Sequence, residues 1–350
     1  MHSRFYETES RRGMREDEML NARLFALAIA ICCWESTQAT GQALAPNGNT
    51  KAAAWKPSRL PDGHPDLQGY WTNNTATPLQ RPAGAGEFLT ADEVNARAGG
   101  QAAQNRNNPF PNLFGITAGD AKYVMRRTSI ITDPPDGKIP PLTPEAQRKY
   151  EADREYHRLH YHDGPEEMTT FERCLVVVTS GPPMLPTAYN NNYQIVQTHD
   201  HVIIMTEMMH DVRIIPLDGR PHDGIRQWMG DARGHWEGAT LVVETTNFNG
   251  KRGYFGPLLF NGDDLKRHDE QMRVIERFTR TAPDILLYQF TINDPGTYTK
   301  TWSGEIEIQA LKGPIIEYAC HEGNQAMGLI LKGARTEEKA AAEAARKKSQ

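Results

Sequence analysis

Alternation of apolar and polar residues in the second half of the chain predicts β-strands. From Leu286 to Ile292 every second residue is apolar, and residues 302–308 repeat the pattern with Trp302, Ile306 and Ile308. Successive side chains of a strand point to opposite faces, so a period of two indicates a strand with one buried face. The same reading, with turn residues as boundaries, gives strands at 66–72, 193–198, 201–207, 211–217, 235–248 (turn at Glu237-Gly238), 272–280, 285–292, 298–310 and 314–320.

The spacing of these strands indicates how they pair. Short consecutive strands with tight turns and no helices between them favour an antiparallel meander, and closing it into a barrel removes both exposed edges. The Gly69-Tyr-Trp71 strand far upstream resembles the first strand of lipocalin-like barrels. We therefore expect a mainly β fold, a lipocalin-like up-and-down antiparallel β-barrel of about 8–10 strands, built as one domain over 67–330.

Residues 75–190 interrupt this pattern with an irregular, proline-rich insertion that we expect to pack over one end of the barrel. Two helix starts stand out within it. Thr90-Ala-Asp-Glu93 is a capping box, in which the threonine and glutamate side chains satisfy free backbone amides. Thr143-Pro144 places proline at the first helical position, where its missing N–H is not needed. The tail at 331–350 is polar and is expected to be a helix or a frayed end.

The N-terminus has the pattern of an export signal. An apolar run of about ten residues after Arg23 is too short to span a bilayer and fits the hydrophobic region of a signal peptide. We expect residues 1–43 to be removed, with cleavage after Ala39 or Ala43, and 44–66 to form a flexible lead-in. An uncleaved anchor is the alternative. Cleavage would place the protein in the periplasm or outside the cell.

Charge and cysteine content narrow the function classes. A formal net charge of −5 argues against nucleic-acid binding, which requires clustered positive charge. No apolar stretch of about 20 residues is available to span a membrane. The cysteines that remain after cleavage, Cys174 and Cys320, are even in number, so in an oxidising compartment they are candidates for a disulfide. Two buried thiols are the alternative.

Histidines near carboxylates and arginines are the main candidates for chemistry. They fall at expected strand ends, which converge around the mouth of a barrel. A histidine beside a carboxylate suits general acid–base work, and an arginine can hold an anionic group. The catalytic candidates are His210, His222, Asp231 and His321, and the substrate-binding candidates are Tyr193, Arg226, Trp228, Glu317 and Tyr318.

Longer segments carry a family resemblance. Tyr189–Thr198, Arg213–His222 with Asp-Gly-Arg-Pro-His, Gln227–Asp231, Gly234–Phe248 and Glu317–Asn324 are similar to a broad family of exported proteins from environmental bacteria. The similarity covers about residues 60–335, with Ala239 where the family commonly has aspartate. This resemblance implies export and the barrel, but it implies no catalytic residue.

Together these features predict an exported, cofactor-free enzyme. It would perform lyase, isomerase or hydratase chemistry on a small apolar or aromatic molecule at the barrel mouth. A periplasmic binding protein for a hydrophobic small molecule is one alternative. A metal-dependent enzyme is another, with His157, His160 and His162 as the candidate ligand group. We expect a small-molecule partner and no bound metal, and the sequence assigns no oligomeric state.

Overall fold

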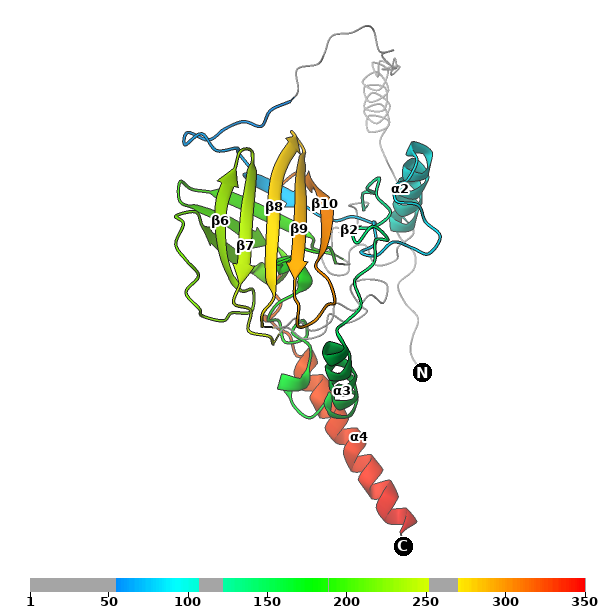
Figure 1. The fold of residues 1–350 in the computed structure, drawn as a ribbon. Helices are drawn as coiled ribbons and strands as arrows, with labels where there is room; N and C mark the ends of the chain where they lie inside the picture. The colour runs from blue at the N-terminus through cyan, green and yellow to red at the C-terminus, as the bar shows by residue number, and fades with distance from the viewer. Residues whose placement is uncertain (1–54, 107–121, 188, 252–269, 350) are drawn as a thin grey trace, which may run out of the picture. The chain divides into compact units, whose positions relative to one another are not determined.

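An antiparallel β-sheet organises the computed structural model, which describes residues 55–106, 122–187, 189–251 and 270–349 (Figure 1). The signal peptide predicted at 1–43 and the first part of the expected lead-in, 44–54, lie outside these residues. Residues 55–66 form a small turn bridged between Arg59 and Pro65. The strands are β1 Gly69–Thr72, β2 Ile131–Asp133, β3 Asn192–Gln197, β4 His201–Thr206, β5 Val212–Pro216, β6 Asp231–Glu237, β7 Thr240–Thr246, β8 Arg273–Ala282, β9 Ile285–Asn293 and β10 Trp302–Ala310.

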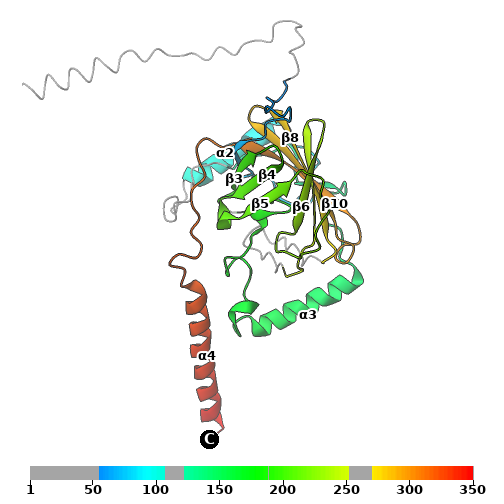
Figure 2. The same cartoon turned by 90° about the vertical axis from the view of Figure 1, so that its left-hand side faces the viewer.

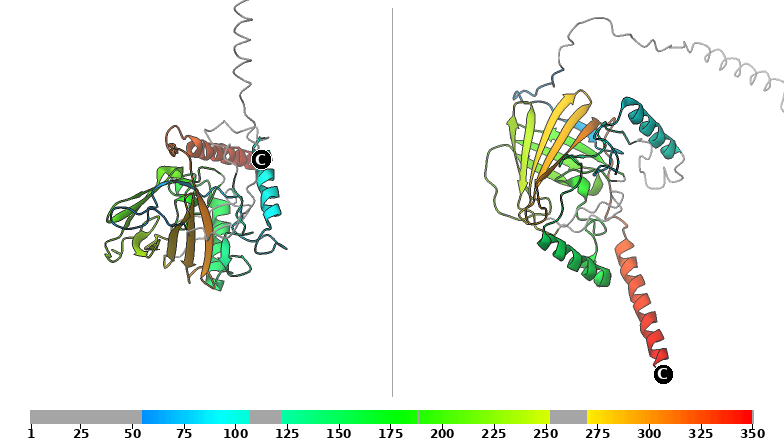
Figure 3. Two further views of the ribbon diagram at one scale, coloured as in Figure 1. Left: turned by 90° about the horizontal axis from the view of Figure 1, so that it is seen from above. Right: turned by 45° about the vertical axis from the view of Figure 1, so that its right-hand side comes forward.

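The sheet consists of two meanders joined through β1. Strands β3 to β5 form one meander and β6 to β10 the other, and β1 pairs with β3 on one side and β10 on the other. The order across the sheet is β5-β4-β3-β1-β10-β9-β8-β7-β6, and β2 pairs separately with β10. Figures 1 and 3 show β6 to β10 as one wall and the strands of the first meander behind it. The mainly β, nearly closed barrel is thus confirmed.

The barrel has a seam between β5 and β6. All eight steps along the strand order are antiparallel, so the two edge strands run in the same direction. Figure 2 shows these edges beside each other, but no hydrogen-bond ladder joins them. They approach closely at one end, where a Cβ on Gly234 would lie 2.8 Å from Ile215 Cγ2 and from Leu217 Cδ2. We call this unpaired junction the seam.

The prediction of a strand at Pro314–Cys320 is wrong. Those residues form no strand. A hairpin partner for β10 would need a free edge beside it, but β10 is flanked by β9 on one side and by β1 and β2 on the other. The segment instead continues irregularly to Gln325 and is held by the disulfide between Cys174 and Cys320. That disulfide was predicted and is confirmed.

The helices begin where the caps predict. Helix α2, Ala91–Arg106, starts after Thr90, whose N–H donates to Glu93 while its hydroxyl accepts from Glu93 N–H. Helix α3, Pro144–His160, is capped by Thr143, which accepts from Ala146 N–H. Helix α4, Ala326–Lys348, buries no residue, and the short 3-10 helices are Pro165–Glu167, Val178–Ser180 and Met208–His210. In the described part of the chain, no helix is both long and apolar enough to cross a membrane.

Large aromatic side chains fill the barrel. Trp71, Tyr288, Phe290 and Trp302 are fully buried on the inward faces of β1, β9 and β10. The insertion also enters this core, because Met184 N donates a hydrogen bond of 2.9 Å to the Tyr288 hydroxyl. Burying an aromatic side chain stabilises the fold by roughly 1.5–3 kcal/mol. Because side chains fill the barrel interior, a ligand site is expected at the seam.

Candidate functional site

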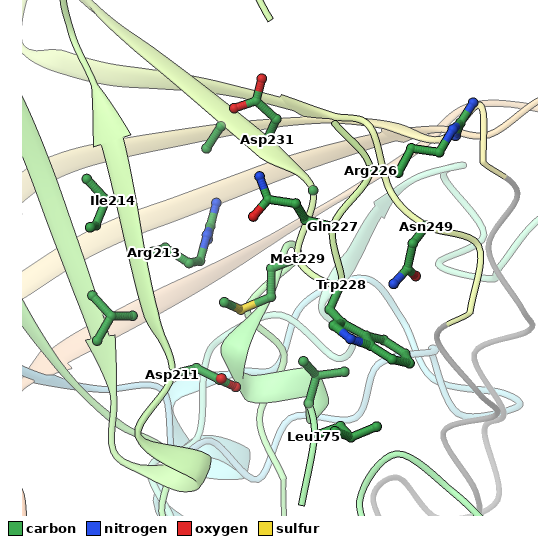
Figure 4. Close-up of a pocket in the computed structure, with 14 residues that line it drawn as sticks. Leu175, Asp211, Arg213, Ile214, Arg226, Gln227, Trp228, Met229, Asp231 and Asn249 are labelled. Carbon is green, nitrogen blue, oxygen red and sulfur yellow. The ribbon is translucent and has the colours of Figure 1, made fainter. Parts of the chain in front are cut away.

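A cavity of about 570 Å³ lies at the open end of the seam (Figure 4). Its walls come from β5, from the start of β6 and the segment before it, and from the loop after Cys174. Its lining residues are Leu175, Val176, Asp211, Val212, Arg213, Ile214, Arg226, Gln227, Trp228, Met229, Gly230, Asp231, Ala232 and Asn249. A cavity of this volume is in the range of small-molecule sites, and its lining mixes apolar side chains with charged and amide groups in similar measure.

The segment before β6 is shaped to leave this space. Gln227 N donates to Asn247 O and Asn249 N donates to Gln227 O, so the segment is fixed to the chain that follows β7. The turn into β6 requires glycine, because Gly230 has a φ of +70° and a Cβ there would lie 2.5 Å from the Thr246 carbonyl oxygen. Gln227 and Met229 then point toward the side of β5 that carries Arg213 (Figure 4).

A buried ion pair lies where the cavity meets the barrel interior. Arg213 of β5 donates to both carboxylate oxygens of Glu276 on β8, and Tyr288 donates to Glu276 Oε1 at 2.8 Å. Burial alone would lower the pKa of Arg213, but attraction to Glu276 outweighs it and the pKa is raised. Burial and the Glu276 charge raise the pKa of Tyr288. Arg213 therefore keeps its charge beside the Glu276 carboxyl group, with Tyr288 as a neutral donor.

A histidine–carboxylate pair adjoins the cavity. His222 Nδ1 lies 2.9 Å from Asp231 Oδ2, which also accepts from Asp223 N at 3.4 Å, and Arg233 binds Asp231 Oδ1. His222 Nε2 lies 3.9 Å from Glu244 Oε1. Asp231 therefore fixes the orientation of the imidazole, and Nε2 is the nitrogen left for proton exchange. Asp231 belongs to the cavity lining, whereas His222 does not.

Arg226 is the most exposed charged group of the cavity, with 47% of its side chain accessible. Its Nη1 donates to Phe248 O and Glu270 O, both at 3.0 Å, and lies 3.3 Å from Glu270 Oε2. Nε and Nη2 make no hydrogen bond to the described residues. They are available to an acceptor on a ligand, for which the planar guanidinium is well suited.

A second group of predicted residues lies at the turn that precedes Asp211. His210 Nδ1 lies 3.3 Å from Tyr318 O, and the Tyr318 hydroxyl lies 3.5 Å from that of Tyr189. The turn that carries His210 has a left-handed backbone at Met209 (φ 61°) and at His210 (φ 44°). Such conformations cost free energy in non-glycine residues and are enriched at functional sites. The irregular segment 314–325 thus rests against a strained turn next to the cavity.

The predicted site residues fall into separate places in the structure: the cavity, the second group, the exposed C-terminal segment and the barrel interior. Arg226, Trp228 and Asp231 line the cavity, and His222 contacts it through Asp231. His210 and Tyr318 meet in the second group, while Glu317 and His321 are exposed on the same C-terminal segment. Tyr193 is fully buried, and its hydroxyl donates to Thr179 O within the barrel. The roles assigned to all these residues stay predictions.

Sequence reasoning missed the Arg213–Glu276 pair. Arg213 falls between two exposed positions of β5, and Glu276 falls between the inward-facing Val274 and Phe278 of β8. In each strand the charged residue takes a position that alternation assigns to the buried face, and this pattern could have identified both residues. Because buried charges in proteins are normally paired, two buried positions of opposite charge in one barrel predict an ion pair.

The histidines of α3 show no arrangement typical of a metal site. Among the described residues, no group of three or more His, Cys, Asp or Glu side chains could hold a metal ion. His160 Nδ1 is 2.6 Å from Asp163 Oδ2, and His157 contacts the Tyr161 ring. The metal-dependent alternative therefore gains no support from the geometry of this helix.

Known proteins give no guide to the function of this chain. No family model, curated protein or solved structure matches the chain. Membership of the family of exported proteins that its motifs resemble thus stays a prediction.

Proposed function

We propose that the protein is an exported binding protein that holds a small molecule with an apolar or aromatic body in the seam cavity. The observation that carries this proposal is the cavity itself, about 570 Å³ with Leu175, Val176, Trp228 and Met229 among its lining residues. Burying a ligand against such side chains removes apolar surface from water, which drives association. Export rests on the predicted signal peptide and agrees with the disulfide.

The polar groups of the cavity indicate what else the ligand carries. The two lining carboxylates have partners already, because Asp211 accepts from the Ser180 hydroxyl at 2.5 Å and Asp231 binds His222 and Arg233. Asn249 Oδ1 already accepts from Lys251 N at 3.0 Å. Within the described residues, the polar groups of the lining left for a ligand are therefore Nε and Nη2 of Arg226, the side-chain amide of Gln227 and Nδ2 of Asn249. We therefore expect a ligand with a carbonyl or carboxylate group beside its apolar part.

Acid–base catalysis is the second candidate function, and the His222–Asp231 pair favours it. A histidine oriented by a carboxylate can act as a general acid or base without a cofactor. Conversion of a bound ligand by the native protein and not by the His222→Ala variant would support catalysis. No conversion by the native protein would leave binding alone, and conversion at the same rate by both would show that His222 is not the acid–base group.

Replacing Trp228 tests the proposed site. We expect Trp228→Ala to weaken binding of the tightest member of a panel of small aromatic and aliphatic carboxylic acids and amides by at least about tenfold. Trp228→Phe retains an aromatic surface and should recover most of the affinity. Calorimetric titration of the three proteins measures the difference.

Trp55→Ala is the matched control, because Trp55 is a partly exposed tryptophan outside the cavity lining. Its affinity should stay within about twofold of the native protein. Equal losses in Trp228→Ala and Trp55→Ala, or no panel member binding more tightly than about 1 mM, would contradict the proposal.

A further inference from the structure

The free edge of β5 presents backbone hydrogen-bonding groups to the seam. Thr206 N donates to Asp211 O at 2.9 Å and Leu217 N donates to Asp200 O at 2.8 Å, in register with the β4–β5 pairing. In an antiparallel ladder, bonded and non-bonded residues alternate. Positions 211, 213, 215 and 217 thus bond to β4, so the N–H and C=O groups of Val212 and Ile214 point away from it.

The cavity runs along this edge. Val212, Arg213 and Ile214 all line it, although their side chains alternate between the two faces of the sheet. Three consecutive residues of a strand can line one space only if that space lies beside the backbone. Gly230, Asp231 and Ala232 line the opposite wall in the same way. The cavity therefore separates two backbone edges that the sheet leaves unpaired.

An extended segment fits between these edges in one direction. Because β5 and β6 run parallel to each other, a chain antiparallel to one is antiparallel to both. Such a segment would extend the barrel path by a tenth strand that pairs with β5, and its other edge would face β6 across the cavity without pairing to it. The close approach of Gly234 to Ile215 and Leu217 ends the available space, so the segment has to be short.

Side chains beside the edge indicate the composition of that segment. Val212 and Ile214 are 43% and 60% exposed on the outer face of β5. Ile214 lies opposite Ile203 and Ile203 lies opposite Val196, so an apolar row crosses three strands and stops at the seam. A strand added to β5 would place its outward side chains next to this row, where apolar and β-branched residues pair well.

From these features we propose that the ligand of the seam cavity is a short extended peptide, about three to five residues long, that pairs with the Val212 and Ile214 backbone. The inference rests on the proposed binding function and specifies its ligand class. The peptide carries apolar residues, its carbonyl groups accept from the two free N–H groups, and its C-terminal carboxylate faces Arg226. Main-chain pairing supplies affinity and the apolar row supplies preference.

N-methylation of the peptide tests this pairing without altering the protein. The probe is a pool of pentapeptides with free carboxylates, rich in Val, Ile, Thr and Tyr, from which the tightest binder is taken. We expect methylation of every second amide to weaken binding at least tenfold, and methylation of the intervening amides to change it less than threefold. Calorimetry or fluorescence anisotropy gives the affinities.

A matched pair of variants tests the protein side. Ile214→Pro removes the N–H that faces the seam, and proline is tolerated on an edge strand. Ile214→Thr changes the side chain and keeps that N–H. We expect the proline variant to bind the peptide at least tenfold more weakly and the threonine variant to stay within threefold. Thermal unfolding of both confirms that β5 is retained.

Three results would overturn the inference. They are no pentapeptide binding, methylation effects without alternation, and a concentration-dependent dimer, lost in Ile214→Pro, that competes with peptide and would assign the edge to a second copy of the chain. If the small acids and amides still bind in a Trp228-dependent way, the proposed function stands and only the peptide class fails. If neither kind of ligand binds, both fail.

Discussion

Replacing Cys174 and Cys320 together by serine lowers the free energy of unfolding by up to about 5 kcal/mol. The disulfide joins residues 146 apart in sequence, and closing so long a loop removes much of the conformational freedom of the unfolded chain. It also fixes the irregular segment 314–325 beside the seam cavity. Urea unfolding of the oxidised native protein and the double variant measures the loss.

Reduction of the native protein provides the control for this prediction. It breaks the same bond without changing a side chain, so its loss of stability should match that of the double variant. A difference below about 1 kcal/mol between oxidised and reduced protein would show that the bond does not constrain the unfolded chain as the entropy model requires.

The Arg213→Ala variant loses about 3–5 kcal/mol of unfolding free energy, because it leaves the Glu276 carboxylate buried without its cation. Arg273→Ala is the matched control. Arg273 pairs with Glu244 at 2.6 Å but is 49% exposed, and surface pairs contribute about 0–1 kcal/mol. Urea unfolding of both variants at neutral pH compares the two ion pairs directly.

Removing both charges distinguishes a charge effect from a packing effect. Arg213→Met combined with Glu276→Leu should recover much of the stability lost in Arg213→Ala, since no unpaired charge remains. Equal losses in Arg213→Ala and Arg273→Ala would contradict the account of a buried pair at the base of the cavity.

The sequence predicted the positions of the strands better than the way in which the sheet closes into a barrel. Alternation located β8, β9 and β10, and the side chains of Thr90 and Thr143 marked the helix starts, because these are local signals. The seam is not local. It depends on β1 pairing with both β3 and β10, residues more than 100 positions away, and on the number of strands, which fixes the directions of the two edges.

The candidate site was predictable to a similar degree. His222 and Asp231 are nine positions apart in a segment rich in charges, and the structure joins them at 2.9 Å. Tyr193 faces the barrel interior because it occupies an inward position of β3, which alternation alone could not distinguish from a site facing a ligand. The turn residue Gly230 gave no indication that residues 226–232 face the start of β5 across a cavity.

Amide hydrogen exchange with and without the tightest ligand of the two screens tests the central claim, that the seam cavity is the binding site. The account predicts slower exchange at Val212 and Ile214 and across 226–232, with Arg213 already protected by β4 and the turn at 237–240 unchanged. Protection confined to the segment 314–325, or to the outer face of β6 to β8, would contradict it.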